Sequence, residues 1–196
     1  MIAAPAALDQ AVRYALAAAE AVTPQLMRRP TPCRGWDLRM LLLHASESLD
    51  ALGEGLSGGR IALLPAAVTD EELADPALAF GRRARTLLAT CRAAQRDGQP
   101  LTQPTVAIAD CPLATGLMIT AGAIEIAVHG WDMASACGRY QEIPPELAAE
   151  LLEAAPFLIT TAGRAPLFGP PVAVPAAASP SDRLTAFLGR PPHPLG

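Results

Sequence analysis

The positions of the prolines constrain the fold of this chain more than any other feature of its sequence. Twenty prolines are spread over 196 residues, and a proline inside a helix removes a backbone hydrogen bond and clashes with the preceding turn. They leave long proline-free windows at residues 6–23, 33–64, 77–99 and 113–143, and a shorter one at 146–155. Four long windows predict four principal helices, which can bury their apolar faces together as a bundle.

Local signals predict the ends of the first two helices. The first window reads as an amphipathic helix from about Leu8. The second begins at Asp37, whose carboxylate can cap the first turn or favour the positive end of the helix. Apolar residues then recur at helical spacing until Gly53 or Gly55, where we expect this helix to end.

The third and fourth helices have similar signals. Asp75 stands directly before a proline, which is the pattern of an N-cap followed by proline at the first helical position. That helix should close before Gly98. The fourth helix should begin after Pro112 and end at Gly138, a residue suited to a C-terminal cap.

The C-terminal part of the chain differs in composition. Nine of the twenty prolines lie in the last 41 residues, so we expect mostly extended chain with one short helix at about 181–188. No run of residues is long enough to predict a sheet. The predicted organisation is therefore an all-α four-helix bundle over residues 1–165, with a proline-rich tail over 166–196 packed on it.

Composition and charge exclude several classes of protein. The net charge is −4 and the arginines are scattered among acids, so no basic stripe for nucleic acid is present. The longest apolar stretch, residues 111–137, is interrupted by three polar groups, which indicates a buried helix and not a membrane span. The chain shows no export signal and its four cysteines have no CxxC spacing. We therefore expect a cytoplasmic protein with reduced thiols.

The three polar groups in that apolar stretch are Glu125, His129 and Asp132. Their spacing of i, i+4 and i+7 places them on one face of a helix. A carboxylate and an imidazole one turn apart can point at the same metal ion. Asp132 could orient the imidazole of His129 or act as a base.

A second helix offers His44, followed three residues later by Glu47. Facing helices of a bundle could thus supply two imidazoles and one or two carboxylates, as bundle metal sites do. Such a set leaves open positions for water or substrate, which is typical of catalytic sites. Neutral imidazole suits zinc, nickel or iron better than magnesium or calcium.

A structural interpretation of the same residues stays open. Glu125 and His129 could form an intrahelical pair, and His44 could be a satisfied core residue. Cys33 is expected to be an inert packed thiol, and Trp36 a core anchor. The residues alone favour neither the metal site nor the polar network.

At these residues the sequence resembles a known group, the DinB-like metal-binding bundles, and within it the branch of the mycothiol-dependent maleylpyruvate isomerases. Three stretches carry the resemblance: residues 31–37 (TPCRGWD) followed by 41–44 (LLLH), residues 125–134 (EIAVHGWDMA), and residues 168–172 (FGPPV) followed by 182–190 (DRLTAFLGR). The second of them is close to the family pattern E-x-x-x-H-G-W-D-L-A.

The resemblance implies a DinB four-helix fold and a divalent metal ion bound by His44, Glu125 and His129. Zinc is the first choice, with nickel and iron as alternatives, and the thiol mycothiol is implied as cofactor or co-substrate. The isomerase itself has a further C-terminal domain that contributes to catalysis, and this chain is too short to contain it. Maleylpyruvate isomerisation is therefore not expected here.

Three functions remain open. The first is a metal-dependent thiol S-transferase acting on a small-molecule substrate, with Asp132 and Glu47 as candidate catalytic carboxylates. The second is a thiol-independent lyase, cyclase or hydrolase of secondary metabolism that uses the metal as a Lewis acid. The third is a non-catalytic bundle that binds a metal or small molecule. The sequence leaves a homodimer open, and it favours neither nucleic acid nor membrane as a partner.

Overall fold

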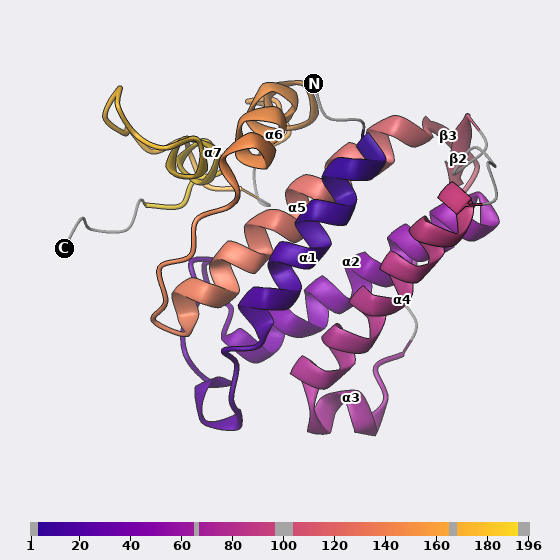
Figure 1. Ribbon diagram of the computed structural model, residues 1–196, viewed down its shortest axis with the longest axis horizontal. Coiled ribbons are helices and arrows are strands. Elements are labelled where there is room, and N and C mark those ends of the chain that lie inside the picture. Colours follow the sequence, from indigo (N-terminus) through magenta and orange to yellow (C-terminus); the bar gives the residue numbers. More distant parts are fainter. Residues whose placement is uncertain (1–3, 65–66, 97–103, 165–167, 192–196) are drawn as a thin grey trace.

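The computed structural model describes residues 4–64, 67–96, 104–164 and 168–191, and the predicted all-helical bundle is confirmed. Figure 1 shows four long helices that lie along one another. Each packs against two of the others, because α1 and α2 both contact α4 and α5. These helices are α1 (Ala4–Ala19), α2 (Leu38–Gly58), α4 (Pro76–Arg96) and α5 (Thr115–Ala136).

The core between these helices is built from aliphatic side chains with few aromatic ones. Val12, Leu42, Phe80 and Ile126, one from each long helix, are fully buried. The closest approach is between α1 and α5, where a side chain at Gly130 would lie 2.9 Å from a backbone atom of α1. Small residues thus let α5, the helix that carries the predicted polar face, approach its neighbours closely.

The second helix begins as predicted and ends later. The Asp37 carboxylate accepts a hydrogen bond from the Met40 amide at 2.9 Å, which caps the first turn. The predicted end at Gly53 or Gly55 is wrong, because α2 continues to a cap at Gly59 with φ of 65°. Gly55 is instead a buried packing position within the helix.

The first and third predicted helices also have clear starts. The Asp75 carboxylate accepts a hydrogen bond from the Leu78 amide at 3.0 Å, which confirms the predicted cap of α4. The predicted start of α1 at Leu8 is one turn late, since the helix begins at Ala4. Pro5 is tolerated there because the amides of a first turn have no partner within the helix.

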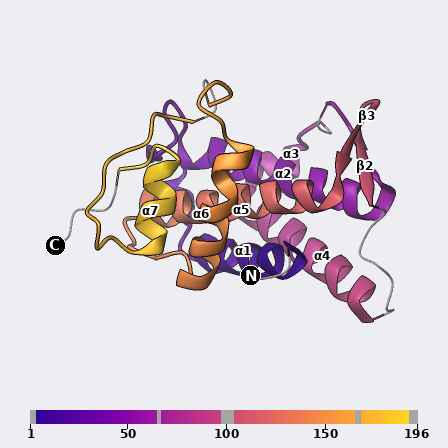
Figure 2. The same ribbon diagram turned by 90° about the horizontal axis from the view of Figure 1, so that it is seen from above.

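A small sheet at one end of the bundle was not predicted (Figure 2). Its strands are too short to give a pattern, and the last of them contains Pro112, which is tolerated on an edge strand. The middle strand pairs in parallel with the first and antiparallel with the third. The strands are β1 (Arg60–Ile61), β2 (Thr105–Ile108) and β3 (Cys111–Ala114), in the order β1-β2-β3.

Three further α-helices and one short 3₁₀ helix complete the described chain: α3 (Asp70–Ala74), α6 (Pro145–Leu158), α7 (Pro180–Phe187) and the 3₁₀ helix η1 (Pro24–Leu26). The sequence did not predict α3 or α6, and Pro156 lies inside the last turn of α6. The short helix of the tail is confirmed as α7, which packs on α6 and ends at Phe187, two residues before Gly189 with its φ of 84°. No described helix combines the length and apolar character that crossing a bilayer requires.

Candidate metal centre

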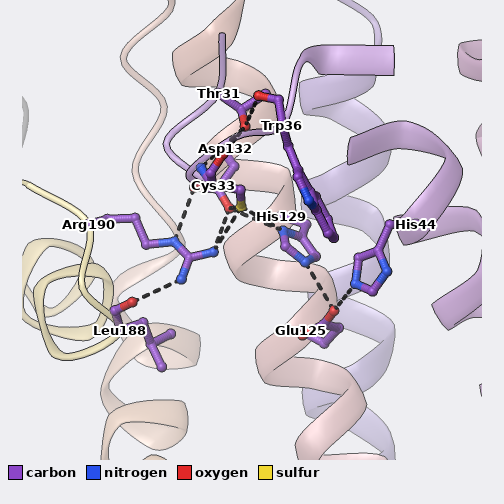
Figure 3. A network of polar contacts seen from close by, with 9 residues as sticks. All are labelled: Thr31, Cys33, Trp36, His44, Glu125, His129, Asp132, Leu188 and Arg190. Atoms are coloured by element: carbon purple, nitrogen blue, oxygen red, sulfur yellow. Dashed lines mark hydrogen bonds and ion pairs between the residues drawn. The ribbon is translucent and has the colours of Figure 1, made fainter. Parts of the chain in front are cut away.

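Two histidines from different helices meet at one carboxylate oxygen (Figure 3). His44 on α2 places Nε2 2.7 Å from Oε1 of Glu125, and His129 on α5 places Nε2 3.0 Å from the same oxygen. One ligand atom from each residue lies within 4.8 Å of the other two. The structure thus brings together the three residues that were predicted as metal ligands.

The site is closed on the side of α5 and open on the side of α2. The side chain of His129 is 8% exposed, whereas Glu125 is 29% and His44 is 36% exposed. Gly122 and Gly130 hold α5 against α2 and α1, because side chains at these positions would collide with Leu52 and with α1. The close packing of α5 therefore holds His129 inside the core and Glu125 at its accessible edge.

Behind His129 lies a buried ion pair. Nδ1 of His129 is 3.1 Å from Oδ2 of Asp132, whose side chain is fully buried. Arg190, which follows α7, contacts both oxygens of that carboxylate, with Nη2 at 2.8 Å and Nε at 3.2 Å. Asp132 therefore contacts His129 from behind and is itself held by a bidentate contact from the tail.

Cys33 joins this buried pair. Its thiol lies 3.1 Å from Oδ2 of Asp132, 3.3 Å from Nη2 of Arg190 and 3.8 Å from Nδ1 of His129. The sulfur is therefore surrounded by polar groups and is not simply packed among apolar side chains. Cys33, His129 and Asp132 form a second group whose ligand atoms all lie within 4.8 Å of one another.

Trp36 covers the two imidazoles. Its ring lies edge-on to His44 at 4.8 Å between centroids and stacks on His129 at 6.3 Å. The prediction of a plain core anchor is therefore incomplete, because this partly buried indole contacts both histidines. The indole therefore forms one wall of the site beside both imidazoles.

The charges of the site depend strongly on one another. Burial disfavours the charged form of Glu125, but the charge of His129 and hydrogen bonds from both histidines hold its pKa below the ordinary value. Burial likewise opposes the charged form of His129, yet Glu125 and Asp132 raise its pKa well above 6.5. Arg190 in turn lowers the pKa of the buried Asp132. In the metal-free protein, both carboxylates thus favour the charged form of His129.

The donor set fits a divalent metal ion. Two imidazole nitrogens and one carboxylate oxygen are a combination that zinc, nickel and iron accept, and exposure at His44 leaves room for a further ligand. The second nitrogen of His129 faces Asp132, the usual arrangement behind a metal-binding histidine. The same distances also suit direct hydrogen bonds from both histidines to Glu125 in a metal-free protein.

Glu47, the other predicted catalytic carboxylate, lies apart from this centre. It belongs to neither group of clustered ligand atoms among the described residues. It lines a cavity of about 420 Å³ together with His44. The structure therefore places Glu47 beside the candidate metal centre and not within it.

Comparison with known proteins identifies the family. The family model for the mycothiol maleylpyruvate isomerase N-terminal domain matches residues 8–134, which include all three predicted ligands. The chain belongs to this family. The mycothiol maleylpyruvate isomerase N-terminal domain is a DinB-like helical domain associated with mycothiol, in agreement with the resemblance seen in the sequence.

Two proteins of Mycobacterium tuberculosis are similar in sequence to this chain. They are the uncharacterized proteins MT0763 of strain CDC 1551 and Rv0738 of strain H37Rv, each 32% identical over 168 residues, with 82% of this chain and 83% of the relative covered. No solved structure matches the chain. Arg190 lies outside the residues that the mycothiol maleylpyruvate isomerase N-terminal domain model matches.

Arg190 is the functional residue that sequence reasoning missed. It is 58 residues from Asp132 in the chain, so no helical spacing connects the two. The available signal was one of charge: an aspartate on an apolar helix needs a buried cation, and Arg190 lies in the third stretch of family resemblance.

Proposed function

We propose that the chain is a metal-dependent enzyme that activates a low-molecular-weight thiol, with mycothiol as the first candidate, and transfers it to an electrophile. The observation that supports this is the convergence of His44, Glu125 and His129 on one accessible point, in a family associated with mycothiol. Zinc is the first choice of metal, with nickel and iron as alternatives.

The residues of the chain divide the chemistry among them. A bound zinc ion would supply a positive charge that lowers the pKa of a thiol and favours the nucleophilic thiolate. Glu47, in the cavity beside His44, would accept the thiol proton and pass it to water. Asp132 would hold the Nδ1 proton of His129, so that Nε2 faces the metal. The thiolate sulfur would then bond to the electrophilic carbon as the leaving group departs with its electron pair.

The cavity beside His44 indicates which substrates fit. Arg83 cannot serve an incoming anion, because it already pairs with Asp50 at 2.6 Å and with Glu72. The charged groups of the cavity are Glu47, Asp50, Glu54, Glu72 and Arg83. The acidic groups therefore outnumber the basic one. This excess of negative charge favours a hydroxyl-rich, neutral or cationic substrate and disfavours a dicarboxylate such as maleylpyruvate.

The test is a conjugation assay. Zinc-loaded protein, mycothiol and a bimane electrophile should give S-conjugate faster than the thiol and electrophile alone. His44→Ala should abolish this rate, whereas Ser57→Ala, at an exposed position near the end of α2, should leave it unchanged. Glu47→Gln should keep the metal and lose roughly 10²–10⁴-fold in rate. A wild-type rate equal to the blank contradicts the transferase proposal.

A second candidate is a non-catalytic binding bundle. The observation that favours it is that both histidine contacts to Glu125, at 2.7 and 3.0 Å, have the length of direct hydrogen bonds. A protein that binds mycothiol in calorimetry without forming conjugate, whether or not zinc has been added, supports this candidate. Turnover of a thiol-free substrate supports instead the lyase, cyclase or hydrolase alternative.

A further inference from the structure

His129 belongs to two overlapping groups of metal-ligating atoms. Through Nε2 it joins His44 and Glu125, here called the histidine set. Through Nδ1 it joins Cys33 and Asp132, here called the thiol set. The ligand atoms of each set lie within 4.8 Å of one another. Geometry alone therefore offers a metal ion two places, one on each side of the same imidazole.

The chemistry of the donors does not favour the histidine set. A thiolate, an imidazole and a carboxylate are all ligands of zinc, and thiolate binds soft ions more strongly than carboxylate does. Cys33 would supply a sulfur ligand where the histidine set has an imidazole. Some other feature must decide which set takes the ion.

That feature is the guanidinium of Arg190, which already occupies the thiol set (Figure 3). Its Nη2 lies 2.8 Å from Oδ2 of Asp132 and 3.3 Å from the sulfur of Cys33. Its Nε contacts the other oxygen of Asp132 at 3.2 Å. A fixed positive charge thus contacts two of the three donors, and a metal ion at the same place would be repelled by it.

The fold holds this guanidinium in place. Nη1 of Arg190 donates to the carbonyl of Leu188 at 2.9 Å, and its backbone amide donates to Thr185 at 2.9 Å. Gly189 has φ of 84°, and a side chain there would lie 2.8 Å from the backbone of Gly169. The turn after α7 is therefore built so tightly that the arginine cannot easily swing away, and its side chain is only 8% exposed.

We propose that Arg190 determines where the metal ion binds: it keeps the thiol set free of metal, so that the ion binds at the histidine set. Loss of its charge opens a latent site formed by Cys33, His129 and Asp132, which takes zinc or cobalt with a sulfur ligand. This proposal rests on the proposed function only in that the histidine set is taken to bind a metal. Arg190 acts through the donors it contacts, so it is a residue that selects the metal position and not a catalytic one.

The test is a titration of metal-free protein with cobalt(II), followed by absorption, because a thiolate ligand adds a sulfur-to-cobalt charge-transfer band. Wild-type protein should bind one equivalent without this band. Arg190→Gln should gain the band, and Arg190→Gln combined with Cys33→Ser should lose it again. Arg190→Lys keeps the positive charge and should behave as wild type, without a sulfur band.

Each result decides the question. A folded Arg190→Gln protein, checked by circular dichroism, that binds cobalt without a sulfur band overturns the proposal. A band in the wild type that Cys33→Ser removes overturns it too, because Cys33 would then already be a ligand. If Arg190→Gln does not fold, the spectra of wild type and Arg190→Lys decide, because a Cys33-dependent sulfur band in either one would show that a positive charge at this position does not keep metal from the thiol set.

Failure of the two proposals is distinguishable. A wild type that binds no cobalt, together with an Arg190→Gln protein that gains the Cys33-dependent band, contradicts the metal site of the proposed function and supports the role of Arg190. One cobalt in the wild type and no sulfur band in folded Arg190→Gln contradicts only the role of Arg190. No cobalt in either protein overturns both.

Discussion

His44 and Glu125 lie 81 residues apart in the chain and meet through a contact of 2.7 Å between Nε2 and Oε1. One residue belongs to α2 and the other to α5, so the contact depends on how these helices pack. A change that shifts α5 by a fraction of an ångström therefore alters the site without touching it.

The packing of α5 can be tested with two glycines on that helix. Gly130→Ala would place a methyl group 2.9 Å from the backbone of Ala15, so we expect a loss of about 1–3 kcal/mol in the free energy of unfolding. Gly116→Ala meets nothing within 4 Å and should be neutral or stabilise by up to about 1 kcal/mol. Urea unfolding of both variants measures the difference. Equal stabilities would contradict the close contact of α1 with α5.

The buried charge behind His129 gives a second prediction. Asp132→Asn leaves Arg190 buried without a full negative partner, and we expect a cost of roughly 3–5 kcal/mol in unfolding free energy. Metal affinity should also fall by about 10–100-fold, because His129 loses the carboxylate that orients it. Asp9→Asn, which removes a partly exposed pair with Arg13, is the control and should cost at most about 1 kcal/mol. An Asp132→Asn protein as stable as the control would exclude the ion pair.

The stability of metal-free protein should depend on pH through His129. Its pKa is raised in the folded state above the ordinary 6.5. The stabilisation from its charge is therefore complete below about pH 6.5 and is lost as the pH rises through the raised value. In chelator-treated protein, the stability advantage of wild type over His129→Gln should shrink as the pH rises from 6.5 towards alkaline values. An advantage that grows with pH would contradict the imidazolium.

We propose that residues 166–196, which the sequence predicts to be a tail packed on the bundle, belong to the same folding unit as residues 1–165. Deletion of 166–196 removes Arg190, the bidentate partner of the buried carboxylate of Asp132, so we expect strong destabilisation. The same deletion with Asp132→Asn should be less harmful because it also removes the carboxylate that has lost this partner. Thermal unfolding of the two truncated proteins tests this, and a truncated chain as stable as the full one would support two independent parts.

The sequence predicts most of the bundle because prolines and caps act locally. Asp37 and Asp75 cap α2 and α4 through side chains that contact their own first turns. The sheet escapes prediction because strands of two to four residues depend on pairing partners far along the chain. Gly55 misled the prediction for the same reason, since only packing distinguishes a buried glycine from a stop signal.

The candidate site likewise has a part that the sequence predicts and a part that depends on the fold. Helical spacing alone places Glu125, His129 and Asp132 on one face, and in the structure His129 contacts both carboxylates. His44 was paired with them through family resemblance, because spacing within one helix cannot reveal a partner on another. Arg190 could not be predicted by spacing at all, because its position depends on the fold of the tail.

The central claim is that His44, Glu125 and His129 bind a divalent metal ion. The most direct test is elemental analysis of protein purified without added metal, repeated on His44→Ala and His129→Ala. We expect close to one equivalent of metal in the parent protein and strong loss in both variants, each still folded by circular dichroism. Retention of the metal in both variants, or a folded parent that carries none and takes up none on addition of zinc, would contradict the claim.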